Sequence, residues 1–354
     1  MWCDLPRKLD TEIRLPEVTG ERCVHALLEQ ASCRACVEGC PRRAWVIDDE
    51  MLGIDPQLCD GCGLCAPLCP QGAIEPLFSL KVKKTASGGA AFAVCEHAEA
   101  AGIDDGRMPC LHVIGLTELL QLYRDGVNHL VTSRGDCSSC GRGGVEHLEQ
   151  RVAEVNRMLA ERGLKALSHR DLDGARWLKA YRRVSELAAE QTLDRRAFFR
   201  GALKAPADRL EQVMEEIPDA FTAPGTLLPR TVPDDSLPFV PRIEAENCNG
   251  CDACVRLCPQ DAITFDDGDS AVPEYRIFPE QCSGCGICTD ICEREAVTLA
   301  QWGRVAEETI PLRSERCRAC GVRFHVPEAA PAGHGLCPIC GKTKHYKNLY
   351  QVMG

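Results

Sequence analysis

The sequence feature that most constrains the fold is a run of cysteines between Cys59 and Pro70. It reads Cys-Asp-Gly-Cys-Gly-Leu-Cys-Ala-Pro-Leu-Cys-Pro, with three closely spaced cysteines and a fourth before a proline. Varied forms of the same phrase occur three more times in the 354 residues. A tight glycine-containing loop can wrap one face of a metal centre with three thiolates but cannot reach the fourth corner. We therefore expect the fourth cysteine of a run to serve a neighbouring centre.

Composition favours metal ligation over disulfide bonding. The chain has 25 cysteines and only 5% aromatic residues. We therefore expect metal sites to stabilise the fold in addition to the apolar core. Many cysteines in a secreted chain usually form disulfides, but residues 1–21 hold no apolar signal core and the spacings suit metal ligands. We therefore expect a cytoplasmic protein. No apolar run is long enough for membrane insertion, and a net charge of −11 argues against nucleic acid as a partner.

The run from Cys59 and the shorter phrase before it form residues 23–80, here called the first cysteine unit. The shorter phrase ends at Cys40-Pro41 and has Gln30 where its leading cysteine belongs. The unit resembles a bacterial-type ferredoxin that binds two [4Fe–4S] clusters with crossed closing ligands. Cys23 is the nearest substitute for the missing ligand, and His25 or a three-iron cluster is the alternative. The resemblance implies two ligand sets: Cys23, Cys33, Cys36 and Cys69; Cys40, Cys59, Cys62 and Cys65.

Residues 242–300, the second cysteine unit, repeat the pattern nearly completely. Its two phrases contain Cys248, Cys251, Cys254 and Cys258, then Cys282, Cys285, Cys288 and Cys292. The same ferredoxin resemblance implies that Cys292 joins the first three and that Cys258 joins the later three. The last phrase departs from the pattern because Glu293 stands where proline is usual. In total the two units predict four [4Fe–4S] clusters.

An internal repeat supports this grouping. Each closing cysteine is followed, four residues later, by an alanine and then by an apolar strand start. These alanines are Ala44, Ala73, Ala262 and Ala296. We expect the small side chain to let the backbone pack closely on the cluster, and the next residue to begin a strand.

Residues 88–190, here called the α/β unit, alternate apolar strands with helical periods. We expect strands at 89–95, 111–114 and 130–132, a helix at Leu116–Arg124, and an amphipathic helix through Val145 and Leu159. This alternation predicts a small α/β unit with a parallel sheet. The whole chain is therefore expected to be an α+β multidomain protein.

Four cysteines of the α/β unit allow two interpretations: Cys95, Cys110, Cys137 and Cys140. Cys137-x2-Cys140 between a strand and a helix resembles a thioredoxin-type redox pair. All four together, with Phe92-Ala-Val-Cys95, Pro109-Cys110-Leu, Asp125-Gly-Val-Asn-His-Leu-Val and Gly135-Asp-Cys137, resemble the delta subunit of methyl-viologen-reducing hydrogenases. That family passes electrons to heterodisulfide reductase, and the resemblance implies one [2Fe–2S] cluster rather than a dithiol or a zinc site. We expect no ligand role for His97, His112 or His147.

The remaining segments are an N-terminal arm (1–22), a linker (191–241) and a C-terminal knuckle pair (313–345). In the linker, Arg195-Arg196-Ala-Phe198 resembles a twin-arginine signal, but no apolar core follows, so export is not expected. A similar segment opens ferredoxins of the nitrate-reductase accessory family, which would fit a gene fusion; a helix with a basic face is the alternative. Prolines between 218 and 241 predict a stiff linker or a strap over a neighbouring surface.

The knuckle pair carries two Cys-x2-Cys-Gly motifs, in which the cysteines are Cys317, Cys320, Cys337 and Cys340. Four thiolates in two such motifs predict a zinc ribbon or a rubredoxin-like iron site. We favour zinc, because the aromatic residues usual around rubredoxin iron are missing. His325 and His334 are not needed as ligands. With this site, the predicted sets include every cysteine except Cys3.

The sequence offers no substrate chemistry. We find no glycine-rich nucleotide loop, no recognisable nucleophile with its base, and no molybdopterin or nickel signature. We expect no catalytic residue, but an electron-transfer wire in which two ferredoxin units flank an α/β redox unit. The resemblances imply donor and acceptor oxidoreductases of hydrogenase, formate dehydrogenase or heterodisulfide-reductase-like type. Alternatives are a thiol–disulfide or low-potential reductase acting through Cys137 and Cys140, and a regulatory iron–sulfur sensor or scaffold.

Overall fold

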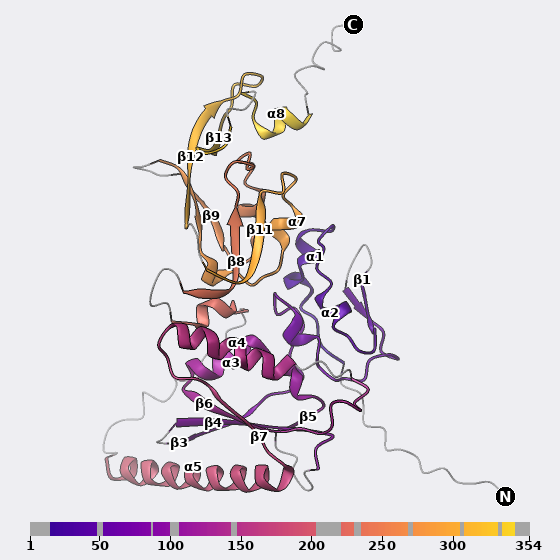
Figure 1. The fold of residues 1–354 in the computed structure, drawn as a ribbon, viewed down its shortest axis with the longest axis vertical. Coiled ribbons are helices and arrows are strands. Elements are labelled where there is room, and N and C mark those ends of the chain that lie inside the picture. Colours follow the sequence, from indigo (N-terminus) through magenta and orange to yellow (C-terminus); the bar gives the residue numbers. More distant parts are fainter. Residues whose placement is uncertain are drawn as a thin grey trace, which may run out of the picture.

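The structure is a computed structural model with an elongated shape (Figure 1). The α/β unit lies at one end and the C-terminal knuckle pair toward the other, with the two cysteine units between them. The described residues are 15–47, 52–85, 88–99, 106–142, 147–202, 221–229, 235–267, 272–304, 308–331 and 335–343. The coarse expectation of a mixed helix-and-strand fold is confirmed.

A five-stranded sheet forms the centre of the α/β unit, with the order β3-β4-β6-β7 and β5 paired to β4. The strands are β3 (Lys81–Thr85), β4 (Gly88–Cys95), β5 (Arg107–Met108), β6 (Val127–Ser133) and β7 (Ser168–Asp171). β4 pairs in parallel with β5 and β6, and β6 with β7. β3 is antiparallel to β4, because the two residues between them in the sequence cannot make the long crossover that a parallel pair requires.

Helices cover both faces of this sheet (Figure 1). α3 (Leu116–Arg124) and α4 (His147–Glu161) lie on one face, and α5 (Gly174–Ala202) lies on the other. Both predicted helices are present. The core is apolar and aromatic: Trp177 on α5 is fully buried, meets Phe92 edge-on at 5.8 Å and donates from Nε1 to the Val131 carbonyl at 3.1 Å.

The predicted strand at 111–114 is wrong. Residues Leu111–Val113 form a 3₁₀ turn, η3, and β5 pairs with β4 in its place. A buried apolar run of four residues has no period that separates a strand from a helical turn. The turn follows Cys110 directly, so that this cysteine lies at the edge of the sheet.

The first cysteine unit has little regular structure. It contains a two-stranded antiparallel sheet of β1 (Trp45–Ile47) and β2 (Leu52–Ile54). Its helical segments are α1 (Val24–Leu27), α2 (Ala35–Glu38) and η2 (Ala66–Leu68), and the turn η1 (Gly20–Arg22) directly precedes it. Val18 bridges to Ile74, and Thr19 N donates to the Ala73 carbonyl at 2.8 Å. Part of the segment expected to be an arm therefore pairs with this unit.

The second cysteine unit and the knuckle pair share one antiparallel sheet of order β13-β12-β10-β9. Its strands are β9 (Ile263–Asp266), β10 (Glu274–Ile277), β12 (Thr309–Arg316) and β13 (Arg323–Pro327). A separate pair joins β8 (Ser236–Ile243) to β11 (Val297–Arg304). The helical segments are α6 (Ala253–Arg256), η5 (Pro279–Gln281), α7 (Ile287–Asp290) and α8 (Pro338–Thr343).

The expected linker is more structured than its prolines predict. Arg195 and Arg196 lie within α5, and residues 203–220 lie outside the described residues. η4 (Pro224–Leu227) and β8 place Leu227 and Val240 in the apolar core of the α/β unit, as a strap would. β8 contains Pro238 and Pro241, and it is an edge strand, where a missing N–H is tolerated. Among the described residues, no helix is both long and apolar enough to cross a lipid bilayer.

Candidate metal centres

Two cavities of the first cysteine unit each gather four cysteines. The lining of one contains Cys23, Cys33, Cys36 and Cys69. The lining of the other contains Cys40, Cys59, Cys62 and Cys65. The closing cysteine of each phrase thus faces the cavity of the other phrase, and the two sets are those expected from crossed ligation.

The second cysteine unit gathers its cysteines in the same crossed way. One cavity is lined by Cys258, Cys282, Cys285 and Cys288. The other four are neighbours: burial raises the pKa of Cys254 to about 12, and the nearby thiols Cys248, Cys251 and Cys292 add to this.

All four closing cysteines share a local hydrogen bond that the sequence reasoning missed. The alanine four residues later donates its backbone N–H to the cysteine sulfur, and these alanines are at most 2% exposed. The N···Sγ distances are 3.3 Å for Ala44, 3.2 Å for Ala73, 3.2 Å for Ala262 and 3.3 Å for Ala296.

The residue before each alanine explains how the N–H reaches the sulfur. It has a positive φ in every case: 54° at Arg43, 57° at Gly72, 51° at Asp261 and 51° at Glu295. This left-handed conformation turns the next N–H back toward the cysteine. Three of the four residues are not glycine, so no residue type marks this conformation in the sequence. Each of the three holds a conformation that costs about 1 kcal/mol or more.

The chemistry of these donor sets fits [4Fe–4S] clusters. Each set offers four thiol sulfurs, the soft donors that iron–sulfur clusters require. Burial raises the pKa of Cys36, Cys62 and Cys282 to about 12, so these thiols keep their protons at neutral pH until a metal centre displaces them. N–H···S bonds then help to stabilise the ligated sulfur.

Cys23 and His25 both line the first cavity, so the structure bears on the missing ligand. His25 Nε2 is already hydrogen bonded to the Cys33 backbone carbonyl at 2.8 Å. This contact occupies Nε2 only, and a histidine that donates one ring N–H to a carbonyl can still bind iron through its other nitrogen. Cys23 and His25 therefore both stay candidates for the fourth ligand, and Cys23 offers the thiol that the other three positions share.

The four cysteines of the α/β unit share one cavity: Cys95, Cys110, Cys137 and Cys140. Cys95 ends β4, Cys110 follows β5 and Cys137 follows β6, so three parallel strands end at this cavity. The ends of parallel strands are where open α/β sheets bind ligands. Burial raises the pKa of Cys110 to about 11, and the other three thiols are close enough to contribute.

The cavity of the α/β unit contacts the first cysteine unit directly. Cys110 packs in one apolar cluster with Cys62 and Leu64. Arg142, which lines the α/β cavity, donates from Nε to Asp60 Oδ2 at 3.0 Å. Burial opposes ionisation of Asp60, but hydrogen bonds from Arg142 and Arg42 hold its pKa below the usual range. Arg142 and Asp60 are not among the candidate ligands, and the cysteine spacing does not point to either residue.

The histidines near this cavity differ in position. His112 is buried, whereas the His97 side chain is exposed and lies 3.4 Å from Glu96. The side chain of His147 lies outside the described residues. His112 faces Cys137 without replacing a cysteine in the set.

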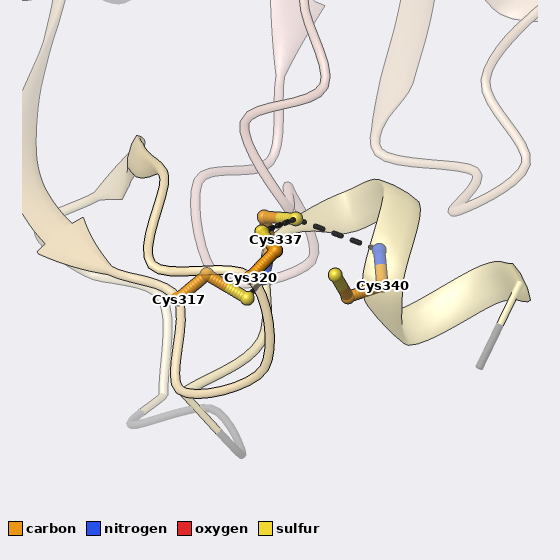
Figure 2. A group of neighbouring side chains, drawn as sticks. All are labelled: Cys317, Cys320, Cys337 and Cys340. Carbon is orange, nitrogen blue, oxygen red and sulfur yellow. Dashed lines mark hydrogen bonds between the residues drawn. The ribbon is translucent and has the colours of Figure 1, made fainter. Parts of the chain in front are cut away.

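The C-terminal cysteines form a compact group (Figure 2), in which the four sulfur atoms lie within 4.8 Å of one another. Cys320 and Cys337 sulfurs are 3.9 Å apart, close to the spacing of about 3.8 Å that tetrahedral Zn–S bonds of about 2.3 Å produce. Burial opposes ionisation of Cys317, but backbone N–H groups, first that of Cys337, lower its pKa to about 6. The group can hold one metal ion.

His325 is not in this group. His325 Nε2 lies 2.7 Å from Asp252 Oδ1 and its ring stacks on Phe265, so it joins the knuckle pair to the second cysteine unit. His334 lies outside the described residues.

Comparisons with known proteins agree with the cysteine geometry. Residues 247–296 match the 4Fe-4S dicluster domain and residues 52–75 match the 4Fe-4S binding domain. An uncharacterized ferredoxin from Methanocaldococcus jannaschii is 35% identical over 52 residues, which are 14% of this chain and 84% of that ferredoxin. The chain belongs to the ferredoxin family. Its two matched regions are [4Fe–4S]-binding domains.

This ferredoxin is also similar to part of a larger oxidoreductase subunit. The indolepyruvate oxidoreductase subunit IorA of Pyrococcus horikoshii is 36% identical over 61 residues, or 17% of this chain and 8% of that subunit. The Archaeoglobus fulgidus IorA is 46% identical over 46 residues, or 12% and 7%. The ferredoxin thus spans less than a tenth of the length of these relatives.

Proposed function

We propose that this ferredoxin relays single electrons through four [4Fe–4S] clusters and one [2Fe–2S] cluster between partner oxidoreductases. One observation carries the proposal: the cysteines fall into separate four-thiol groups, and contacts join the α/β cavity to the first cysteine unit and that unit to the second. When bound, such clusters accept and release one electron at a time. The protein supplies burial, N–H···S bonds and local charge, which tune the potential of each centre.

The contacts support an order that differs from the chain order. The α/β cavity meets the first cysteine unit through Cys62, Cys110 and the Asp60–Arg142 ion pair. Inside that unit, Cys36 and Cys65 of its two cavities pack in one apolar cluster with Trp45. The first cysteine unit also contacts the second through Gln71 and Ser283. Along these contacts it lies between the α/β cavity and the second cysteine unit, whereas the sequence places the α/β unit between the two.

The convergence of four thiols favours a cluster in the α/β unit over a dithiol reductase. A thioredoxin-type pair needs only Cys137 and Cys140, yet Cys95 and Cys110 line the same cavity. A reactive thiol also needs a lowered pKa, and burial, with Cys95 adding to it, raises the pKa of Cys137. We assign this site the [2Fe–2S] cluster that the hydrogenase delta-subunit resemblance implies.

We assign the knuckle pair one structural zinc ion, with rubredoxin-type iron as the alternative metal. The similarity to IorA supports a partner of the oxidoreductase class, and the hydrogenase, formate dehydrogenase and heterodisulfide-reductase-like systems are the candidates that the delta-subunit resemblance adds. The net charge of −11 suits a partner with a basic docking face.

Iron and acid-labile sulfide analysis with EPR of the reduced, anaerobically purified protein tests the proposal. We expect cubane signals from four clusters and one [2Fe–2S] signal. Cys59→Ser should remove one cubane signal and spare the metal of the knuckle pair, and Cys3→Ser serves as the matched control. Rapid alkylation of Cys137 or Cys140 in the iron-loaded protein would instead support the reductase. If Cys59→Ser leaves the iron content unchanged, Cys59 does not belong to the proposed ligand set.

A further inference from the structure

Gln71 is a buried polar residue that ligates nothing yet lies between the two cysteine units. Its side chain is 3% exposed. Its Nε2 donates to Ser283 Oγ at 2.6 Å, and its Oε1 accepts a hydrogen bond from Gln260 Nε2 at 2.9 Å. Both ends of the amide therefore have partners, and both partners belong to the second cysteine unit. A buried amide bonded at both ends has a fixed position.

Each of these three residues lines a cysteine cavity. Gln71 follows Cys69-Pro70 and lines the cavity of Cys33. Ser283 follows Cys282, and Gln260 follows Cys258-Pro259; both line the cavity of Cys285. The hydrogen bonds thus span the wall between one cavity of each unit. Gln71 and Gln260 occupy the same position in two of the four repeats, two residues after the closing cysteine.

A second, exposed contact joins the same two cysteine units through other segments. The backbone N–H of Ser32 donates to Asp290 Oδ2 at 2.7 Å, and its hydroxyl donates to Oδ1 at 2.8 Å. Ser32 precedes Cys33, and Asp290 ends α7, between Cys288 and Cys292. Figure 1 shows α7 beside the first cysteine unit, although the two segments are far apart in the sequence.

We infer that the two cysteine units exchange electrons across the contact at Gln71, here called the junction. The Gln71 amide holds together the segments that line the Cys33 and Cys285 cavities. The inference rests on the proposed relay and adds where the units meet. With [4Fe–4S] clusters bound in the two cavities, the step would move one electron, so that one cluster would be oxidised and the other reduced by one electron each. No covalent bond forms or breaks and no proton moves. Gln71 is a positioning residue in this step.

The test compares Gln71→Leu with wild type in the iron-loaded full chain. Leucine keeps most of the volume but removes both hydrogen bonds. Ser283→Ala removes only the acceptor of Nε2 and is the second variant. Gln121→Leu is the matched control, because Gln121 on α3 of the α/β unit donates a side-chain hydrogen bond to Asp125, which directly follows that helix.

The main measurement is the magnetic interaction between reduced clusters, seen as splitting and broadening in EPR spectra of the fully reduced protein. Gln71→Leu should lose the part of this interaction that crosses the junction, and electrons should equilibrate more slowly between the units after rapid partial reduction. Ser283→Ala should also weaken the magnetic interaction and slow the equilibration of electrons between the units. Gln121→Leu should match wild type in both, and all variants should keep the wild-type iron and sulfide content.

An unchanged spin–spin interaction in both Gln71→Leu and Ser283→Ala, at full iron content, would overturn the inference and leave the relay standing. Failure of the wild-type protein to take up electrons into several clusters would overturn the relay itself. If Gln71→Leu loses iron, Ser283→Ala decides, since it leaves Gln71 and every cysteine in place.

Discussion

The Nε2 atom of His112 lies 3.9 Å from the Sγ atom of Cys137. On the other side of the ring, Nδ1 accepts a hydrogen bond from the Leu148 backbone N–H at 3.3 Å. The neutral imidazole therefore carries its proton on Nε2 and directs it at the cysteine sulfur. Such an N–H···S bond stabilises the extra negative charge that a cluster gains on reduction.

His112→Leu should lower the reduction potential of the cluster proposed for the α/β unit. A hydrogen bond contributes about 1 kcal/mol, and about 1.4 kcal/mol corresponds to about 59 mV for one electron, so a fall on the order of 40 mV is expected. EPR-monitored redox titration measures it. His97→Leu is the control, because His97 lines the same cavity with an exposed side chain. Equal potentials in the two variants would refute the role of His112.

Cys23→Ser should convert the cluster of the first cavity into a three-iron cluster, while the other clusters stay intact. The reason is that Cys23 lines that cavity with Cys33, Cys36 and Cys69. EPR of the oxidised protein detects a three-iron cluster. His25→Gln should leave the cluster intact, since Cys23 would then supply the fourth ligand and His25 only the hydrogen bond to the Cys33 carbonyl. A three-iron signal already present in wild type would exclude Cys23 as the fourth ligand.

Gly250→Ala should destabilise the protein more than Gly126→Ala does. Both glycines have positive φ, 69° and 78°, so alanine at either costs about 1–2 kcal/mol in backbone strain. A Cβ at Gly250 would also lie 2.0 Å from the His325 carbonyl oxygen, whereas nothing lies within 4 Å at Gly126. Overpacking adds about 1–3 kcal/mol. Thermal unfolding of the iron-loaded variants gives the comparison, and equal losses would contradict the packing of the knuckle pair on Gly250.

Cys340→Ser should remove the metal of the knuckle pair without changing iron–sulfide content. Cys340 is fully buried within the four-sulfur group, and a structural metal contributes its binding energy to folding. We expect elemental analysis to show the loss of one zinc, and hydrogen exchange to rise in β13 and α8 with little change in α6 and α7. Loss of cubane EPR signals in this variant would mean that the site and the clusters are not independent.

Acidification should destabilise the β6–β7 edge of the α/β sheet through His169. Thr132 donates its hydroxyl proton to Asp171 at 2.9 Å, so His169 Nε2 must donate to Thr132 Oγ1, also at 2.9 Å. Burial is the main cause of the lowered pKa of His169, and Arg134 adds to it, whereas Glu149 and Asp171 act in the opposite direction.

The sign follows from proton binding. Because the folded pKa lies below the ordinary 6.5, the unfolded state binds more protons in acid, so stability is full above about pH 6.5 and falls as the pH drops toward the folded value. Hydrogen exchange of β6 and β7 should therefore rise more between pH 7 and about 5 in wild type than in His169→Gln. His129→Gln is the control, since His129 is exposed on β6. A parallel rise in all three proteins would refute the prediction.

Sequence spacing indicates which cysteines of one run lie together, because that spacing is a local property. Cys59, Cys62 and Cys65 line one cavity while the closing Cys69 lines the other, and the alanine after each closing cysteine marked the repeat. The helix at Leu116–Arg124 was also predictable, since its apolar period is strong. Short apolar stretches were not, as the turn at Leu111 shows, because four buried residues carry no period.

The contacts between units could not be predicted from the sequence. Gln71 and Ser283 are 212 positions apart, and the motifs around them do not predict that the two side chains meet. Arg142 and Asp60 likewise meet only because the sheet edge of the α/β unit lies against the first cysteine unit. Long-range polar pairs of this kind depend on how whole units dock, which local spacing does not encode.

The 212 positions between Gln71 and Ser283 also mean that the two residues are synthesised at different times. At 5–20 residues per second, a ribosome needs roughly 10–40 s to make the chain between them. During that interval the cavity of Cys33 has all its cysteines but lacks the wall that the second cysteine unit supplies. The nascent chain thus offers iron–sulfur carriers an open approach to the first cysteine unit, and oxygen the same approach, until the junction closes.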